Sequence, residues 1–439
     1  MSFTDAIAGF VTETPESALP ESARAVIRLS LLDWLSVGRA GIEEPVSRIV
    51  ADLVLAEAGM GEASGFGQAQ RLPARAAALL NGTTSHALDY DDTHFLHIGH
   101  PSVTVFPAAL AVAERQGATG AEFLAACVLG YEASCRIGHW LGRAHYQVGY
   151  HQTATAGCFG AALAAGRLLK LDRAQMAQVI GLASTRAAGL KSQFGTMGKP
   201  YNAGQAASAG VEAALLVAFG MGSTPAGLDG PQGFGETHHG EANREALAGL
   251  GEVFVLEGTS YKFHACCHGT HAALEALRAL LPVEDLETID SVQIHTHPRW
   301  LSVCNIANPQ TGLEAKFSYR LTAAMALAGV ETGALESFSD ETCALPTLTA
   351  LRDRVEVVAD EGIAESASHV SLRLNTGQTR EAHHDLNAEI SLHSKALRLR
   401  EKSIALLGLP MAEAVSQAVM GLAGAADVTA LGALLRADP

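Results

Sequence analysis

The sequence has few aromatic residues, few cysteines and no long apolar segment. Aromatic side chains make up only 5% of the 439 residues, and alanine and glycine are abundant, a composition typical of closely packed helices. The seven cysteines are odd in number and scattered, which disfavours a disulfide framework and favours reduced thiols. No stretch approaches the roughly 18 to 20 apolar residues that span a bilayer, and the N-terminus shows no basic segment followed by an apolar one. We therefore expect a cytoplasmic protein.

Positive charge is also scarce. The 30 lysines and arginines are outnumbered by 46 aspartates and glutamates, which gives a formal net charge of −16. This balance argues against nucleic acid or an anionic membrane as a partner. It leaves room for a small anionic substrate, because a local group of lysines and histidines can reverse the field inside a pocket. Dinucleotide-binding, P-loop and Gly-x-Ser-x-Gly motifs are absent, which disfavours nicotinamide cofactors, nucleotides and serine-hydrolase chemistry.

The chain changes character at about residue 258. Before this point apolar residues recur at helical spacing in one segment after another, as in Val26, Ile27 and Leu31. After it, alternating patterns predict strands over 289–297, 355–359 and 369–375, and a helical pattern returns from about residue 395. Helices are predicted over 46–58, 73–81, 107–116, 121–143, 154–169, 173–189, 202–219 and 271–281, and a helix is also predicted to open at Pro101.

A chain of this length is expected to form two domains. The two kinds of pattern predict a mostly α protein. Its large all-helical domain comprises residues 1–258 plus 395–439, and a smaller α+β domain is inserted at 259–394.

The densest group of ionisable side chains lies just before Pro101. Residues 86–100 contain three carboxylates and four imidazoles, which are Asp89, Asp91, Asp92, His86, His94, His97 and His100. An Asp-Asp-Thr run followed by a proline is poor material for a helix, so we expect a loop. Carboxylates act as bases and imidazoles titrate near neutral pH, so this loop suits proton transfer or metal binding.

Other segments place ionisable groups among glycines and small residues. They are 146–153 with His151, 192–201 with Lys199, 261–271 with Lys262, and the weaker 314–320. A single histidine near a helix start is more often a cap than a catalyst, and a single lysine is usually solvated. None of these segments identifies a site by itself.

Metal binding is a competing interpretation of the histidines. The spacing of His94, His97 and His100 and the group around 264–271 both supply ligand types that zinc accepts. Neither pattern matches a closed structural zinc site or the HExxH motif of metalloproteases. A metal-dependent hydrolase is therefore the less favoured alternative.

Five motifs, found in the expected order, resemble the MmgE/PrpD family. They are NGTTSHALDYDDTH with HPS, GYHQTATAG, GTMGKPYNAGQAASAG, YKFHACCHGTHAALEAL and GLEAKFSY, and the resemblance runs from about residue 15 to about 410. The family contains 2-methylcitrate dehydratase, cis-aconitate decarboxylase and iminodisuccinate epimerase. The resemblance implies a large all-helical domain with a smaller α+β lid domain, a homodimer, and a site that needs neither metal nor organic cofactor.

The resemblance also implies which residues form the site. The positions assigned to catalysis are Asp89, His100, His151, Lys199 and Lys262. The positions assigned to substrate binding are Thr93, Thr196 and His268. The loop has one residue more than the family pattern between Thr93 and His100, and Cys267 competes with His268 for its position.

These residue types suit chemistry next to a carboxylate. The two lysines can bind carboxylates, the two histidines can act as general acid and base, and Asp89 can orient an imidazole. We predict a cofactor-independent lyase that acts on a small di- or tricarboxylate by proton transfer at a carbon next to a carboxylate, of the dehydratase or decarboxylase type. An isomerase that epimerises an amino- or imino-dicarboxylate on the same site is the alternative. Which histidine is the acid stays open.

Overall fold

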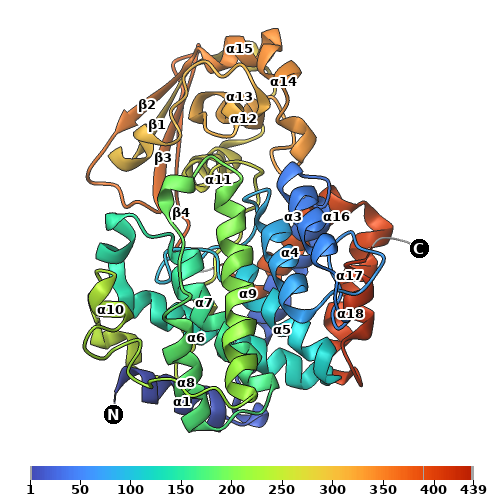
Figure 1. The fold of residues 1–439 in the computed structure, drawn as a ribbon. Coiled ribbons are helices and arrows are strands. Elements are labelled where there is room, and N and C mark those ends of the chain that lie inside the picture. Colours follow the sequence, from blue (N-terminus) through green and yellow to red (C-terminus); the bar gives the residue numbers. More distant parts are fainter. Residues whose placement is uncertain (1, 389, 437–439) are drawn as a thin grey trace. The chain divides into compact units, whose positions relative to one another are not determined.

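The computed structural model describes residues 2–388 and 390–436, and the chain is mostly helical with one small sheet (Figure 1). Residues 1, 389 and 437–439 fall within the predicted domain ranges 1–258, 259–394 and 395–439, and they lie outside the described residues. Contacts divide the chain into two compact units, one of residues 2–261 with 407–436 and one of residues 262–406. Segment 395–406 thus groups with the second unit. None of the helices described has the length and apolar character needed to cross a bilayer.

The first unit is built from helices. They are α1 (Phe3–Glu13), α2 (Glu21–Ala40), α3 (Pro45–Glu57), α4 (Ala74–His86), α5 (Ser102–Gln116), α6 (Gly120–Val148), α7 (Gln152–Leu168), α8 (Arg173–Ala183), α9 (Gly198–Ala218), α10 (Phe234–Thr237), α17 (Leu409–Gly421) and α18 (Thr429–Ala433). The prediction that helices dominate this part of the chain is confirmed.

Several predicted helix boundaries are wrong, since α4 ends at His86 rather than 81 and α9 begins at Gly198 rather than 202. α5 begins at Ser102, as the predicted opening at Pro101 requires, and carries Pro107 in its interior. Nearly the whole helix is buried, so packing outweighs the hydrogen bond that proline cannot donate. α8 ends at Ala183 rather than at 189. Just after this end, Ser184 Oγ donates to the Gly181 carbonyl at 2.6 Å, and this local hydrogen bond competes with continuation of the helix.

The core of the first unit depends on small residues. A Cβ atom on Gly82 of α4 would lie 2.8 Å from the Cα of Gly204 in α9, and one on Gly204 would lie 2.1 Å from Thr83 Oγ1. Larger residues at these two positions would push the helices apart. The predicted inert thiols Cys127, Cys135 and Cys158 are buried in α6 and α7, and all seven cysteines are free.

The second unit combines helices with a four-stranded sheet. Its helices are α11 (His271–Leu280), α12 (Gly312–Ala315), α13 (Tyr319–Leu327), α14 (Asp340–Ala344), α15 (Pro346–Arg352) and α16 (Leu392–Leu407), and its strands are β1 (Ile289–Thr296), β2 (Val355–Ala359), β3 (Ala367–Leu374) and β4 (Thr379–Asp385). The strand order is β2-β1-β3-β4, with β1 parallel to β2 and the other pairs antiparallel.

The three predicted strands are confirmed, but β4 was not predicted. Its sequence, Thr-Arg-Glu-Ala-His-His-Asp, has almost no apolar residues. Polar side chains suit an edge strand because they discourage pairing with other chains. Pairing with β3, and not an alternating pattern, makes this segment a strand.

Candidate active site

Residues 87–101 form a loop between α4 and α5, as predicted. Asp89 turns the chain in the left-handed region with φ of 50°, a conformation that aspartate tolerates better than most residues. Further along, the backbone N–H of His100 donates to Thr153 Oγ1 at 3.1 Å, so the start of α7 holds the loop. A Cβ on Gly99 would lie 2.7 Å from that same Thr153 oxygen. This close approach requires glycine.

Asp91 is the centre of the buried charge in this loop. Its Oδ1 accepts a hydrogen bond from His86 Nδ1 at 2.9 Å, and its Oδ2 lies 2.9 Å from His100 Nδ1. The second pair is equally close, so the carboxylate attracts a proton on Nδ1 of this ring as well. Burial raises the pKa of Asp91, but the two imidazoles outweigh it and hold that pKa well below its usual range. An ionised Asp91 therefore places a proton on Nδ1 of both rings.

Asp89 links the loop to the first turn of α9. Lys199 Nζ lies 2.6 Å from Asp89 Oδ2, and His100 Nε2 lies 3.6 Å from Asp89 Oδ1. The Asp89 side chain is 42% exposed, whereas that of Asp91 is fully buried. Asp91, rather than Asp89, thus makes the closer contact that orients the imidazole.

His151 stands at the N-cap of α7 and is buried. Its Nδ1 lies 3.2 Å from Asn202 Nδ2, and the same amide nitrogen lies 3.3 Å from the Leu190 carbonyl. An amide nitrogen beside a carbonyl donates, so His151 Nδ1 accepts, and the neutral ring carries its proton on Nε2. Burial, followed by the nearby His86 and Lys199, holds the pKa of His151 well below its usual range.

Three imidazoles therefore lie close together with different proton positions. The ring centroids of His86 and His100 are 4.6 Å apart, and those of His86 and His151 are 6.0 Å apart. Asp91 holds the Nδ1 protons of His86 and His100, so Nε2 is the atom at which these two rings exchange a proton, while Asn202 leaves a protonated Nε2 on His151. The group can accept and deliver protons at the same time.

Asp92, next to Asp91, is buried in a neutral network. Burial, aided by neighbouring carboxylates, raises its pKa to about 7. Ser102 Oγ and Tyr131 OH both donate to its Oδ2, and Tyr131 OH lies 2.9 Å from Thr259 Oγ1. The Asp92 carboxyl group therefore ties the loop to α5 and α6, and none of its described contacts is with the three imidazoles.

Asp92→Asn is expected to change the pH dependence of stability. Because the pKa of Asp92 is higher in the folded state than its ordinary 3.8, the protonated carboxyl group contributes its full stabilisation below pH 3.8. This contribution is lost as the pH rises to about 7. Between pH 4 and pH 8 the free energy of unfolding of the Asn variant should gain up to about 4 kcal/mol relative to wild type. Urea unfolding at several pH values measures this difference. A constant difference across the range would contradict a neutral Asp92.

Two histidines of the loop have structural partners. His94 Nε2 lies 2.7 Å from the Val255 carbonyl, and His97 Nε2 lies 2.9 Å from Ser134 Oγ. Burial lowers the pKa of His97 to about 3, so it remains neutral. These contacts hold both rings against other parts of the first unit, which disfavours the alternative that His94, His97 and His100 bind one zinc ion.

The two threonines assigned to substrate binding lie at the margins of the group. Thr93 is half-buried and its backbone pairs with Ser260, with N–H to carbonyl distances of 2.8 and 2.9 Å. Thr196 is exposed, its Oγ1 donates to the Gln193 carbonyl at 2.9 Å, and it accepts from Gly198 N–H at 3.0 Å. The Thr196 hydroxyl thus contacts the first residue of α9, the helix that carries Lys199.

Lys262 and His268 belong to the second unit and are described within it. Lys262 is buried, and His268 is half-buried with its ring 5.0 Å from that of His271. Cys267 is half-buried, and its backbone N–H donates to the Lys316 carbonyl at 2.9 Å. The competition between Cys267 and His268 for the site stays open.

Four residues of the loop region have the donor types and spacing of a cation site. One ligand atom each from His86, Asp89, Asp91 and His100 lies within 4.8 Å of the others. Nitrogen and carboxylate donors suit zinc or iron. The Lys199 ammonium at 2.6 Å from Asp89 already places a positive charge in this group, which disfavours a second cation.

Comparison with protein families identifies the chain along most of its length. The MmgE/PrpD N-terminal domain matches residues 5–246, and the MmgE/PrpD C-terminal domain matches residues 264–392. The chain belongs to the MmgE/PrpD family. The resemblance carried by the five motifs is thereby confirmed.

Similar members of the MmgE/PrpD family include fungal and human proteins. A cis-aconitate decarboxylase-like protein of Aspergillus oryzae is 30% identical over 294 residues, 63% of this chain and 61% of that protein. Cis-aconitate decarboxylase of Aspergillus terreus is 29% identical over 292 residues, with 63% and 60% covered. The human cis-aconitate decarboxylase is 27% identical over 307 residues, with 66% and 63% covered. The matched part of the chain spans about three fifths of the length of these relatives.

Three contributors to the geometry of this MmgE/PrpD chain were not assigned from the sequence. They are His86, Asp91 and Asn202. The alternation Asp89-Tyr-Asp91 was a usable signal, because a carboxylate two residues from a candidate base can face the same pocket in a loop. Asn202 had no comparable signal, since it lies one helical turn beyond the glycines that flank Lys199.

Proposed function

We propose that this MmgE/PrpD chain is a cytoplasmic, cofactor-independent lyase for a small di- or tricarboxylate, of the decarboxylase or dehydratase type. The observation that carries the proposal is one ammonium group, Lys199, beside Asp89 and a group of imidazoles with opposite proton positions. An ammonium group attracts a substrate carboxylate, and paired imidazoles move protons on carbon. The relatives named cis-aconitate decarboxylase support the same class of reaction.

We infer the roles of the two catalytic histidines from their partners. His151 is neutral and keeps its proton on Nε2, because Asn202 occupies its Nδ1, so it donates a hydrogen bond to negative charge on the substrate. His100 has its Nδ1 against ionised Asp91, so its Nε2 is the atom that takes up and delivers the proton. The first turn of α9 adds the positive end of a helix dipole to the charge of Lys199, which favours carboxylate binding there.

These roles fit both lyase reactions. In decarboxylation the carbon–carbon bond to the departing carboxylate breaks, its electron pair stays on the substrate as an enolate-like carbanion, and protonated His100 delivers a proton to carbon as CO₂ leaves. In dehydration neutral His100 removes the proton next to a carboxylate and returns it to the hydroxyl group, which leaves as water, while His151 donates a hydrogen bond to the developing negative charge. Lys199 stabilises the negative charge that develops in either reaction.

The second unit completes the proposal. We propose that residues 262–406 form the lid domain of the family, that Lys262 and His268 add a second positive group to the site, and that the protein is a homodimer. Light scattering of the purified protein tests the dimer. Loss of activity in Lys262→Gln, with unchanged thermal stability, tests the lid lysine.

Proton NMR in D₂O tests the reaction. Citrate, 2-methylcitrate, cis-aconitate and iminodisuccinate are supplied separately to the purified protein. A decarboxylase forms itaconate and CO₂ from cis-aconitate, and a dehydratase forms an unsaturated acid, seen as a vinyl proton from citrate or as a methyl group on a double bond from 2-methylcitrate. Deuterium at a stereocentre without a change of skeleton would instead identify the epimerase alternative. No reaction or exchange with any acid would overturn the substrate class.

The four-residue cation site keeps one alternative open, a metal-dependent hydrolase. We expect full activity after treatment with a chelator followed by gel filtration. Activity that falls on chelation and returns with added Zn²⁺ or Fe²⁺ would favour the alternative.

A further inference from the structure

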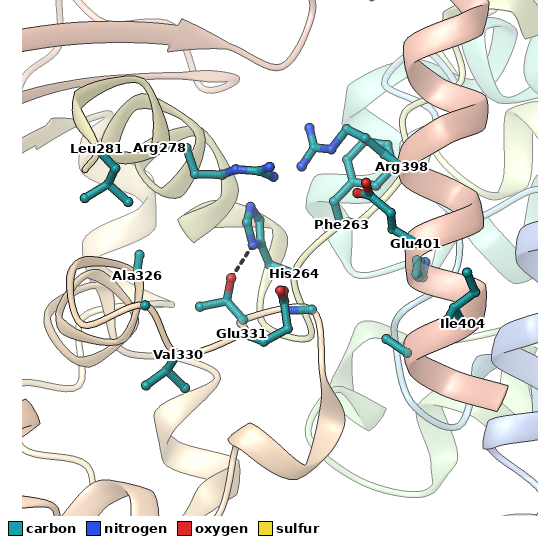
Figure 2. Close-up of a pocket in the computed structure, with 15 residues that line it drawn as sticks. Phe263, His264, Arg278, Leu281, Ala326, Val330, Glu331, Arg398, Glu401 and Ile404 are labelled. Carbon is teal, nitrogen blue, oxygen red and sulfur yellow. Dashed lines mark hydrogen bonds between the residues drawn. The ribbon is translucent and has the colours of Figure 1, made fainter. Parts of the chain in front are cut away.

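A cavity in the second unit lies among residues that the proposed reaction does not use. It has a volume of about 570 Å³, within the roughly 300–1,000 Å³ typical of small-molecule sites. Its walls come from segment 263–264, the end of α11, the loop after α13, and α16 (Figure 2). All of these residues belong to the same compact unit.

Two guanidinium groups converge on this cavity. Figure 2 shows Arg278 of α11 and Arg398 of α16 pointing toward each other above His264. They share one carboxylate oxygen, Glu275 Oε1, which is bonded by Arg398 Nη2 and lies 3.8 Å from Arg278 Nη1. His264 Nε2 contacts this same oxygen at 2.9 Å. One carboxylate oxygen therefore serves three nitrogen donors.

The histidine adds no charge to this group. Burial lowers the pKa of His264, and its Nδ1 lies 2.7 Å from Thr332 Oγ1, which can donate to it. The neutral ring thus donates from Nε2 to Glu275. Two guanidinium charges then face a single carboxylate charge, so the cluster has a net charge of about +1 and N–H donors in excess of acceptors.

The orientation of Arg398 is held by packing. Its guanidinium carbon lies 3.8 Å from the centroid of the Phe263 ring, which supports the planar face and leaves the edge for hydrogen bonds. Arg278 is half-exposed, with 52% of its side chain accessible. The packed guanidinium of Arg398 and the more exposed one of Arg278 can together bind the two oxygens of a carboxylate.

The rest of the lining limits the class of ligand. Leu281, Val330 and Ile404 give the cavity apolar walls that suit an aliphatic body (Figure 2). Glu331, Glu401 and Lys402 also line it, and the two carboxylates outweigh the one ammonium group, which disfavours a ligand with several negative groups. We propose that this cavity is a binding site for a small aliphatic monocarboxylate, with its carboxylate between Arg278 and Arg398.

Methyl NMR of the full-length protein tests this site independently of any catalysis. Isovalerate is titrated into protein labelled at Ile, Leu and Val methyl groups, and the signals of Val330 and Ile404 are followed. We expect saturable shifts of these signals. Citrate, sulfate and 3-methylbutan-1-ol should each bind at least tenfold more weakly, because they carry too many charges, no apolar body or no carboxylate.

Variants locate the binding. Arg278→Gln should weaken isovalerate binding at least tenfold, and Val330→Phe should do the same by filling the cavity, so the test does not depend on the more buried Arg398. Arg373→Gln, an exposed arginine on β3 paired with Asp290 at 3.3 Å, should leave binding unchanged. Equal binding of the alcohol, unchanged binding in Arg278→Gln, or shifts that vanish only in Lys199→Gln would each overturn the proposal.

Discussion

Replacing Asp91 by Asn is expected to lower kcat by roughly 10³- to 10⁴-fold, as removal of the orienting carboxylate does in other imidazole-based sites. Asp91 faces Nδ1 of both His86 and His100 at 2.9 Å. An amide can accept from one ring but must donate to the other, so one imidazole is forced into the wrong tautomer. KM should change by only a few-fold because no contact to the substrate is removed. Steady-state kinetics with the acid identified by NMR measure both constants.

Asp92→Asn is the matched control for this prediction. Asp92 is the adjacent residue and equally buried, but its raised pKa makes it a neutral group that asparagine resembles. Its activity near pH 6 should stay within tenfold of wild type. Equal losses in the two variants would indicate a general disturbance of the loop, and full activity of Asp91→Asn would contradict the assigned proton positions.

Replacing Lys199 by Gln is expected to reduce kcat/KM by at least about 10³-fold, since a buried charge contact to the developing anion is lost. Part of the loss should appear in KM, because Lys199 also binds the substrate carboxylate. Stability should change by less than about 1 kcal/mol, since Asp89 is 42% exposed and can be hydrated without its partner. Kinetics and thermal unfolding together separate the two effects.

Lys191→Gln provides the control for charge alone. Lys191 lies in the same connection before α9, but its Nζ donates to the Tyr146 carbonyl at 3.1 Å and rests on the Tyr146 ring at 3.8 Å. This variant should retain activity within a few-fold of wild type. A comparable loss in both variants would mean that net positive charge, and not the position beside Asp89, is what the reaction requires.

The helices were predictable because their apolar residues recur at helical spacing and their ends carry recognisable signals. Asp172 caps α8 and Pro20 precedes α2, and both residue types are common at helix starts. Strand β4 was not predictable. It is formed by pairing with β3, which outweighs the local preference of its residues.

The candidate site divides in the same way. The dense group at 86–100 and the isolated His151 and Lys199 were visible as unusual residues in their surroundings. Lys199 was expected in a loop but lies in the first turn of α9, where the helix dipole adds to its charge. Its distance from Asp89 depends on the crossing of α4 and α9 at Gly82 and Gly204.

The sequence by itself determined the family, the mostly helical character, the residue types available for chemistry and the loop that holds most of them. Tertiary structure alone decided which carboxylate meets which imidazole, and therefore where each proton lies. The physical reason is that proton positions depend on contacts between atoms a few ångströms apart, such as His86 with Asp91 and His151 with Asn202. Such contacts join different elements, and local sequence patterns carry no record of them.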